Sequence, residues 1–294
     1  MGHTSPLRTP AAVAPALRCG RFVLPLRRPL IMGVVNVTPD SFSDGGRYLD
    51  VAAAIDHGRR LVEEGADLLD VGGESTRPGA QPLPLEEELR RVLPVVEALG
   101  DLGVPVSIDT YKPAAMRAAL GAGASMINDV SALQAPGALD VARSSDCAVC
   151  LMHMRGNPQT MQASPEYRDV VAEVREFLAQ RVAACEAAGI ARDRIVVDPG
   201  FGFGKKAAHN LELLRHLDAI ASLGLPVLVG LSRKSTLGKI TGKPVAQRAS
   251  ESVAAALLAV QRGAAIVRVH DVDQTRDALL VLRAIENPAT CFDA

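Results

Sequence analysis

Short apolar runs that end in a polar residue recur along the chain, and each follows an amphipathic stretch that closes on glycine. Examples are EEGADLLDVGG (63–73), GAGASMINDV (121–130) and QRGAAIVRVHD (261–271). The glycine is typical of a helix C-terminus, and a β-branched apolar run is typical of a parallel strand buried on both faces. Each repeat therefore predicts one helix followed by one strand.

Eight such strands are predicted, with helical patterns between them. Their ranges are 30–37, 67–73, 104–110, 125–130, 147–153, 194–199, 226–232 and 265–271. Helical patterns cover 51–65, 86–100, 113–123, 168–189, 210–224, 251–263 and 275–285, with a short one at 137–145. Eight alternations predict an α/β protein with a single (β/α)8 barrel over 21–290.

The segments outside the repeats suggest a cap and a tail. RFVLPL (21–26) is expected to cap the bottom of the barrel, and residues 1–20, with three prolines, are expected to form a flexible extension. A doubly wound sheet is the competing fold, and it usually carries a glycine-rich phosphate turn after its first strand. The glycines of GFGFG (200–204) are spaced two apart and do not match that turn. The barrel is therefore favoured.

Composition limits the partners of the chain. Its 294 residues carry 32 basic and 33 acidic side chains, a net charge of −1, so neither a nucleic acid nor an anionic membrane is favoured as a partner. The five cysteines are odd in number and irregularly spaced, which favours free thiols and a cytoplasmic location. Cys147 and Cys150 should lie on opposite faces of a strand. No apolar stretch is long enough to suggest a transmembrane helix.

Polar side chains gather at the carboxyl ends of the predicted strands, which meet at one mouth in a barrel. Individually each has an ordinary explanation: Asp109 or Asp129 could cap a helix, and His153 could be a core histidine. Together they combine carboxylates, amides and cations without a nucleophile motif or a metal-binding spacing. This mixture suits a flat heterocycle bound beside a phosphate. The set is Asn36, Asp70, Asp109, Asn128, His153, Asp198, Arg233, Lys234, Arg268 and His270.

Eight motifs in this order resemble the dihydropteroate synthase family over about residues 30 to 272. They are MGVVNVTPDSFSDGG, DVGGESTRPGA, SIDTYKP, IND, LMHMRGNPQTMQ, VVDPGFGFGK, GLSRKS and IVRVHDV. The resemblance implies a transferase that joins 6-hydroxymethyl-7,8-dihydropterin diphosphate to 4-aminobenzoate, giving 7,8-dihydropteroate and diphosphate. It also implies a homodimer, for which the alanine-rich SVAAALLAV helix is a candidate interface.

The same resemblance assigns roles to individual residues. Asp198 matches the aspartate on the pterin's N–H edge, Lys234 the lysine on its ring oxygen, and Asp109 and Asn128 further pterin contacts. Asn36 matches the diphosphate-site residue that also ligates Mg²⁺. The diphosphate site is further matched by Thr76, Arg268 and His270, and the residues expected in catalysis are Thr76, Arg77, Lys234, Arg268 and His270.

Aminobenzoate is expected on the other side of the mouth. Phe42, Pro78, Phe201 and Ser235 match its pocket, with Phe201 as a wall and Phe203 packed inward. The loops that carry Phe42 and Thr76 are expected to close over the substrates.

Catalysis in this family is thought to begin with departure of diphosphate, so the protein needs no nucleophile of its own. Two alternatives are a pterin-dependent methyltransferase and a non-catalytic relative that retains the barrel. The first has no use for a diphosphate site, and the second would be expected to lose some of the motif residues.

Overall fold

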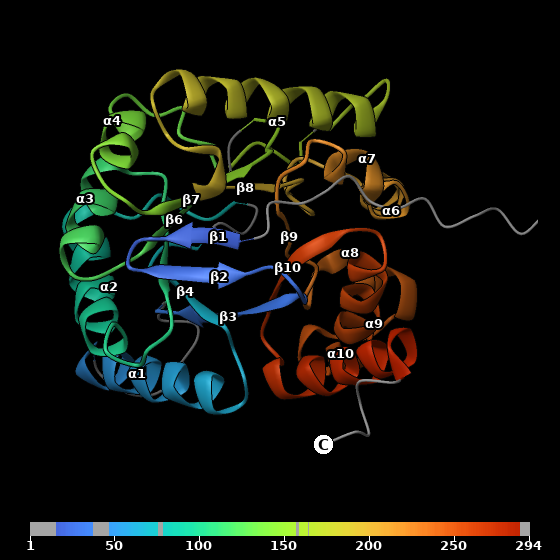
Figure 1. Ribbon diagram of the computed structural model, residues 1–294, viewed down its shortest axis with the longest axis horizontal. Helices are drawn as coiled ribbons and strands as arrows, with labels where there is room; N and C mark the ends of the chain where they lie inside the picture. Colours follow the sequence, from blue (N-terminus) through green and yellow to red (C-terminus); the bar gives the residue numbers. More distant parts are fainter. Residues whose placement is uncertain (1–15, 38–46, 76–78, 157–158, 164, 289–294) are drawn as a thin grey trace, which may run out of the picture.

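The computed structural model describes residues 16–37, 47–75, 79–156, 159–163 and 165–288. Eight parallel strands close into a barrel in the order β10-β3-β4-β5-β6-β7-β8-β9 (Figure 1). The fold predicted from the alternating pattern is confirmed. The strands are β3 (Leu30–Asn36), β4 (Leu68–Gly72), β5 (Val106–Asp109), β6 (Met126–Asp129), β7 (Ala148–Met152), β8 (Ile195–Asp198), β9 (Val227–Val229) and β10 (Ala264–Val269).

Helices surround the barrel on its outer side (Figure 1). They are α1 (Arg47–Glu63), α2 (Leu85–Leu99), α3 (Pro113–Gly121), α4 (Ala138–Arg143), α5 (Val170–Ala187), α6 (Ala207–Arg215), α7 (Leu217–Ala221), α8 (Ser235–Thr241), α9 (Ala249–Val260) and α10 (Val272–Glu286). Two 3₁₀ turns, η2 (Arg192–Arg194) and η3 (Val245–Gln247), complete the connections.

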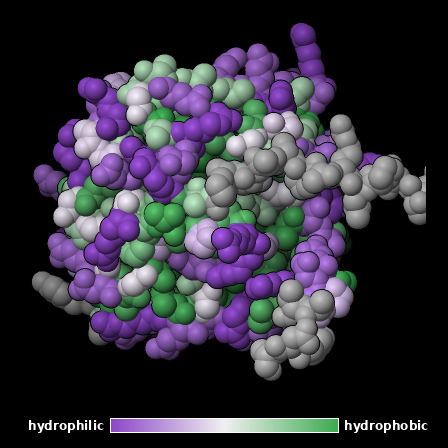
Figure 2. All heavy atoms as spheres, in the orientation of Figure 1, coloured by the Kyte–Doolittle hydropathy of each residue, from purple (hydrophilic) through white to green (hydrophobic). Residues whose placement is uncertain are grey.

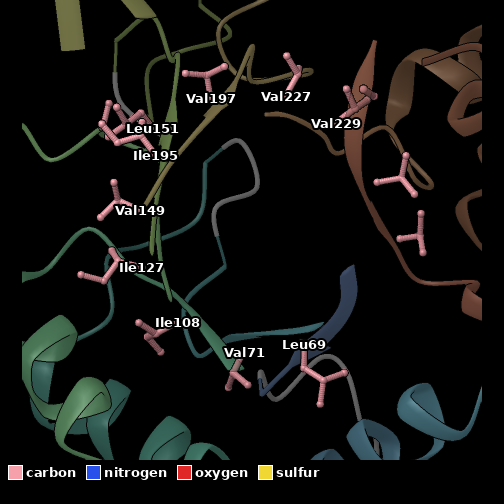
Figure 3. Close-up of a cluster of buried hydrophobic side chains, with 14 of the residues drawn as sticks. Leu69, Val71, Ile108, Ile127, Val149, Leu151, Ile195, Val197, Val227 and Val229 are labelled. Atoms are coloured by element: carbon pink, nitrogen blue, oxygen red, sulfur yellow. The ribbon is translucent and has the colours of Figure 1, made fainter. Parts of the chain in front are cut away.

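Alternate residues of each strand point outward and pack beneath the helices. Figure 3 shows Leu69, Val71, Ile108 and Val149 in this layer, which runs from strand to strand around the barrel. Because side chains alternate across a strand, the residues between them, such as Asp70, point into the barrel. Cys147 belongs to the outer cluster and Cys150 to the inner one, so the two thiols lie on opposite faces as predicted.

The lower interior of the barrel is apolar and is covered by a hairpin, which lies in front in Figure 1. The hairpin joins β1 (Ala16–Cys19) to β2 (Phe22–Pro25). Leu17 and Cys19 are fully buried against inward side chains such as Met32. The expected cap is confirmed. Figure 2 shows that hydrophilic and hydrophobic side chains are mixed on the face of the molecule that carries this hairpin. The polar residues at the carboxyl ends of the strands, such as Asp198, lie at the opposite end of the barrel.

Two predicted boundaries were wrong. The flexible extension was expected to reach residue 20, yet β1 begins at Ala16, because burial of Leu17 and Cys19 stabilises an ordered strand there. The helix expected over 210–224 is two helices that meet at His216, where the backbone leaves helical geometry. Residues 1–15 lie outside the described part of the chain.

Candidate active site

Four polar side chains form the floor of the mouth, which is the open end of the barrel. They are Arg268 on β10, Asp70 on β4, Asp109 on β5 and Asn128 on β6. Arg268 on β10 donates from Nε to Asp70 Oδ2 at 2.6 Å and from its terminal nitrogen to Asp109 Oδ2 at 3.0 Å. Asn128 donates from Nδ2 to the same Asp70 oxygen at 2.9 Å. Asp70 is fully buried, and its other carboxylate oxygen has no partner among the described residues. Asp109 and Asn128 keep some exposed surface and are the polar acceptors of the floor that a ligand in the mouth can reach.

Burial and crowding of carboxylates change the protonation of this floor. Desolvation and the nearby Asp70 raise the pKa of Asp109 to about 7, although the Arg268 charge opposes the shift. Conversely, the Arg268 pKa is raised by the two carboxylates despite its burial, so this side chain stays charged. The floor can therefore gain or lose one proton at Asp109 near neutral pH.

Asp198 and Lys234 are electrostatic neighbours at the mouth. Asp198 ends β8, and its Oδ1 accepts a hydrogen bond of 2.7 Å from the Gly200 N–H. Burial raises the pKa of Asp198, while that N–H and the neighbouring Lys234 act against the shift. Desolvation lowers the pKa of Lys234 to about 8, and its Nζ donates to the Phe201 carbonyl at 2.8 Å. A carboxylate and an ammonium group thus face one opening, ready to meet complementary edges of a ring.

His270 directly follows β10, and Asn36 ends the neighbouring strand β3. The Nδ1 atom of His270 and the Ser232 hydroxyl are 2.9 Å apart, and burial together with Arg268 lowers the pKa of His270 to about 4. The half-buried Asn36 ends β3, which pairs with the strand that carries Arg268. These groups lie on the side of the mouth expected to bind diphosphate.

Arg233 has a strained backbone just before Lys234. Its φ is +56°, an unusual value for a side chain of this size. Its guanidinium pairs with Asp271 through two hydrogen bonds of 2.5 and 3.1 Å, and its N–H donates to the Ser252 hydroxyl. The pair ties the turn that carries Lys234 to the residue after His270, so both sides of the mouth are fixed relative to each other.

The two phenylalanines of the GFGFG loop are placed in the reverse of the predicted manner. Phe201 is only 1% exposed and belongs to the outer core, whereas Phe203 is half-buried with its ring centroid 4.2 Å from Lys234 Nζ. The positive φ of Gly200 turns the chain after the strand, so the first phenylalanine points into the core. Ser235 begins helix α8 as expected and borders a pocket of about 300 Å³ with Gly202 and Thr236.

His153 and Asp129 follow the ordinary explanations. His153 is buried against Phe177, and desolvation with nearby cations lowers its pKa to about 3, so its ring is neutral. Asp129 accepts from the N–H groups of Ser131 and Leu133 and holds the turn that follows β6. Neither side chain belongs to the polar floor.

A buried ionic cluster that the sequence did not predict lies beside the loop that follows β4. Lys112 Nζ donates to Glu74 at 2.5 Å and to Glu88 at 2.6 Å, and it also reaches the Leu83 carbonyl. The Tyr111 hydroxyl donates to Glu74 at 2.9 Å. The cluster fixes both ends of the connection between β4 and α2. In the sequence, Glu74, Glu88 and Lys112 are isolated charges outside the predicted strands. Their spacing does not indicate that they pair with one another.

Four expected site residues fall outside the described part of the chain: Phe42, Thr76, Arg77 and Pro78. Within that part, no group of three or more His, Cys, Asp or Glu side chains has the arrangement of a metal site. No helix among the described residues is long and apolar enough to cross a membrane.

Comparison with known proteins agrees with this geometry. The family model described as "Pterin binding enzyme" matches residues 32–270. The chain is 53% identical to a dihydropteroate synthase of Neisseria meningitidis serogroup B, with 91% of this chain and 96% of the relative covered. The barrel, its polar mouth and this match define the class: the chain belongs to the pterin-binding enzyme family.

Similar solved structures indicate which group of this family the chain belongs to. The Xanthomonas albilineans dihydropteroate synthase with 4-aminobenzoic acid is 56% identical, with a TM-score of 0.88 and coverage of 93% of this chain and 99% of that one. The same enzyme with 7,8-dihydropteroate is 54% identical, with a TM-score of 0.85 and coverage of 92% and 99%. Within the family, the chain belongs to the dihydropteroate synthases, which are transferases.

Proposed function

We propose that this chain joins 6-hydroxymethyl-7,8-dihydropterin diphosphate to 4-aminobenzoate at the carboxyl end of its barrel. The observation that carries the proposal is the arrangement of the mouth. Arg268 bridges Asp70 and Asp109, while Asp198 and Lys234 face the same opening. A ring with N–H groups on one edge and oxygen on another has a partner for each edge there.

The pterin is assigned to the inner part of the mouth. Asp198 accepts from the N–H edge, and Lys234 donates to the ring oxygen after releasing the Phe201 carbonyl that it contacts in the free protein. Asp109 and Asn128 supply further contacts from β5 and β6.

The diphosphate is assigned to the side that holds Asn36, Arg268 and His270, with Thr76 as a further contact. The donor set there fits Mg²⁺ bound mainly by diphosphate and water. Asn36 offers one hard amide oxygen, and the described residues provide no cluster that would bind the ion alone. Mg²⁺ bound there would neutralise charge on the leaving group. Asn36 is the residue that would hold it.

Aminobenzoate is assigned to the outer side, between Phe203 and the start of helix α8. The half-buried Phe203 ring replaces Phe201 as the wall of this pocket, since Phe201 is enclosed in the core. Ser235, at the first position of α8, is placed to meet the carboxylate. Phe42 and Pro78 remain assigned to this pocket from the sequence.

Catalysis requires positioning and charge stabilisation. The bond between the exocyclic methylene carbon and the diphosphate oxygen breaks, and the arylamine nitrogen then forms the new bond and loses a proton. The ring is held by Asp198 and Lys234, while Arg268, His270, Thr76 and Arg77 stabilise the departing diphosphate. With its pKa lowered to about 4, His270 is neutral and acts as a hydrogen-bond donor.

Two further properties belong to the proposal. The chain forms a homodimer through α9 and α10, where Leu258, Leu280, Val281 and Ile285 are exposed by 42 to 71%. It works in the cytoplasm, because the four cysteines in the described region are buried free thiols, which is typical of a reducing compartment.

The experiment that tests the reaction is a coupled assay on the purified protein. Diphosphate release and dihydropteroate formation should both require the pterin diphosphate, aminobenzoate and Mg²⁺. The absence of dihydropteroate with all three present, from protein whose thermal unfolding is cooperative, would overturn the proposal.

A further inference from the structure

One buried cation, Lys205, has no role in the reaction described above. Lys205 is 3% exposed, and none of the ion pairs among the described residues involves it. Its Nζ lies 2.9 Å from the Gly200 carbonyl, 3.0 Å from the Phe203 carbonyl and 3.2 Å from the His153 carbonyl. A fourth contact, 2.9 Å, is to Nδ1 of His153. A buried ammonium group is costly, so these four acceptors must compensate for its desolvation.

The acceptors belong to two loops that follow neighbouring strands. The GFGFG loop follows β8, and His153 follows β7. Gly200 and Gly204 have φ values of +67° and +61°, and a side chain at Gly200 would place its Cβ 2.0 Å from the His153 carbonyl oxygen. The two backbones therefore touch, and their carbonyl oxygens converge on one point. Without a cation there, the converging dipoles would repel one another.

The same loop carries groups that face the mouth. The Gly200 N–H donates to Asp198, and the Phe203 ring contacts the Lys234 ammonium. Asp198 is also held by its strand, because its carbonyl accepts from the His153 N–H at 2.9 Å. Phe203 has no such strand partner. Its carbonyl is held by Lys205, so loss of that contact should disturb the ring of Phe203 more than the carboxylate of Asp198.

We propose that Lys205 is a positioning residue for dihydropteroate synthesis: its ammonium group folds the 200–204 loop so that Phe203 forms the wall of the aminobenzoate pocket. This inference rests on the proposed function. Lys205 does not touch either substrate in this account. Its effect should fall on the binding of aminobenzoate, with little effect on the chemical step or on the pterin.

The charge on Lys205 can be varied with pH. Burial lowers its pKa to about 7, helped by the positive Lys234 and Arg155 and opposed by Asp198. The fourth neighbour, His153, is neutral because its own pKa is lowered to about 3. Since its folded pKa is below the usual value, Lys205 loses its proton as pH rises through neutrality. One donor is then lost and the loop should loosen.

The test compares Lys205→Met, which keeps the unbranched stem of the side chain but lacks the ammonium group, with Lys205→Arg and the control Lys243→Met. Lys243 is exposed, pairs with Glu251 and does not line the pocket that Ser235 borders. Lys205→Met should raise the KM for aminobenzoate at least tenfold, with kcat and the KM for the pterin diphosphate within threefold. Lys243→Met should leave all three within twofold.

A pH series separates positioning from a general structural role. In the wild type, the KM for aminobenzoate should rise between about pH 6.5 and pH 8.5. Lys234, with a pKa of about 8, also loses its proton in this range, so the effect of Lys205 is the part of the rise that is lost in Lys205→Arg, whose guanidinium keeps its charge. An unchanged aminobenzoate KM in a folded Lys205→Met protein would overturn the inference. If neither variant folds, a flat wild-type profile over this range would overturn it instead. An inactive wild type would refute the proposed function, which is a separate outcome.

Discussion

Arg268 and Asp70 are 198 positions apart in the chain, yet Arg268 Nε donates to Asp70 Oδ2 at 2.6 Å inside the barrel. The contact joins β10 to β4 across the interior, and the second branch of the guanidinium reaches Asp109 on β5 at 3.0 Å. One planar cation thus spans two carboxylates on neighbouring strands. Under the proposed assignment of the substrates, this cation would link recognition of the pterin ring to stabilisation of the leaving diphosphate.

Replacing Arg268 with lysine should separate charge from geometry. Lysine keeps the positive charge but lacks the planar fork that pairs with two carboxylates at once. We expect kcat/KM to fall at least a hundredfold, roughly 3 kcal/mol in transition-state stabilisation. Steady-state kinetics on both substrates measure this effect. A loss of less than fivefold would show that the double pairing is unimportant.

Asp109 should make the free protein less stable as pH rises. Its pKa is raised from 3.8 to about 7, so the folded state binds a proton that the unfolded state has already lost between these values. Stability relative to Asp109→Asn, whose amide cannot ionise, should therefore fall by about 2–3 kcal/mol between pH 5 and pH 8. Guanidinium unfolding at both pH values measures it. An equal difference at both would contradict the raised pKa.

The ionic cluster around Lys112 should be essential for stability. Removing this cation by Lys112→Met leaves Glu74 and Glu88 facing each other in a buried site, with side-chain exposures of 9% and 1%. We expect a loss of about 3–5 kcal/mol. Arg59→Met, which breaks an exposed pair with Asp56, should cost below about 1 kcal/mol. Similar losses in both variants would show that burial of the cluster has no special effect.

The proposed dimer can be tested on α10. Leu280→Glu combined with Val281→Glu places two charges where the side chains are 55% and 60% exposed in the single chain. Light scattering should show a dimer for the wild type and a monomer for this variant. Val23→Glu, on the hairpin at the bottom of the barrel, is the control, since Val23 is 64% exposed there. A dimer that persists in the α10 variant would place the interface elsewhere.

Much of the fold could be predicted because the barrel strands are short, largely buried apolar runs and several of the preceding helices end at or near glycine. The eight strands and the position of Asp70 or Arg268 on them follow from this periodicity. The orientation of Phe201 and Phe203 did not follow, because it depends on positive φ values at Gly202 between them and at the flanking Gly200 and Gly204. The contacts of Lys205 and Lys112 were also beyond prediction. They depend on backbone carbonyls and carboxylates brought together by different loops.

In the proposed site, Asp198 accepts hydrogen bonds from the N–H edge of the pterin. Calorimetry on Asp198→Asn with a pterin analogue measures how much this contact contributes to binding. An amide places an NH₂ group against ring donors, which should cost roughly 2–5 kcal/mol through a lost charge-assisted hydrogen bond and an unsatisfied buried group. Asp129→Asn is the control, since Asp129 is a buried carboxylate whose hydrogen bonds come from the turn after β6. We predict that Asp198→Asn abolishes measurable binding while unfolding remains cooperative and the control still binds. A loss of less than about tenfold in affinity for folded Asp198→Asn would contradict the account.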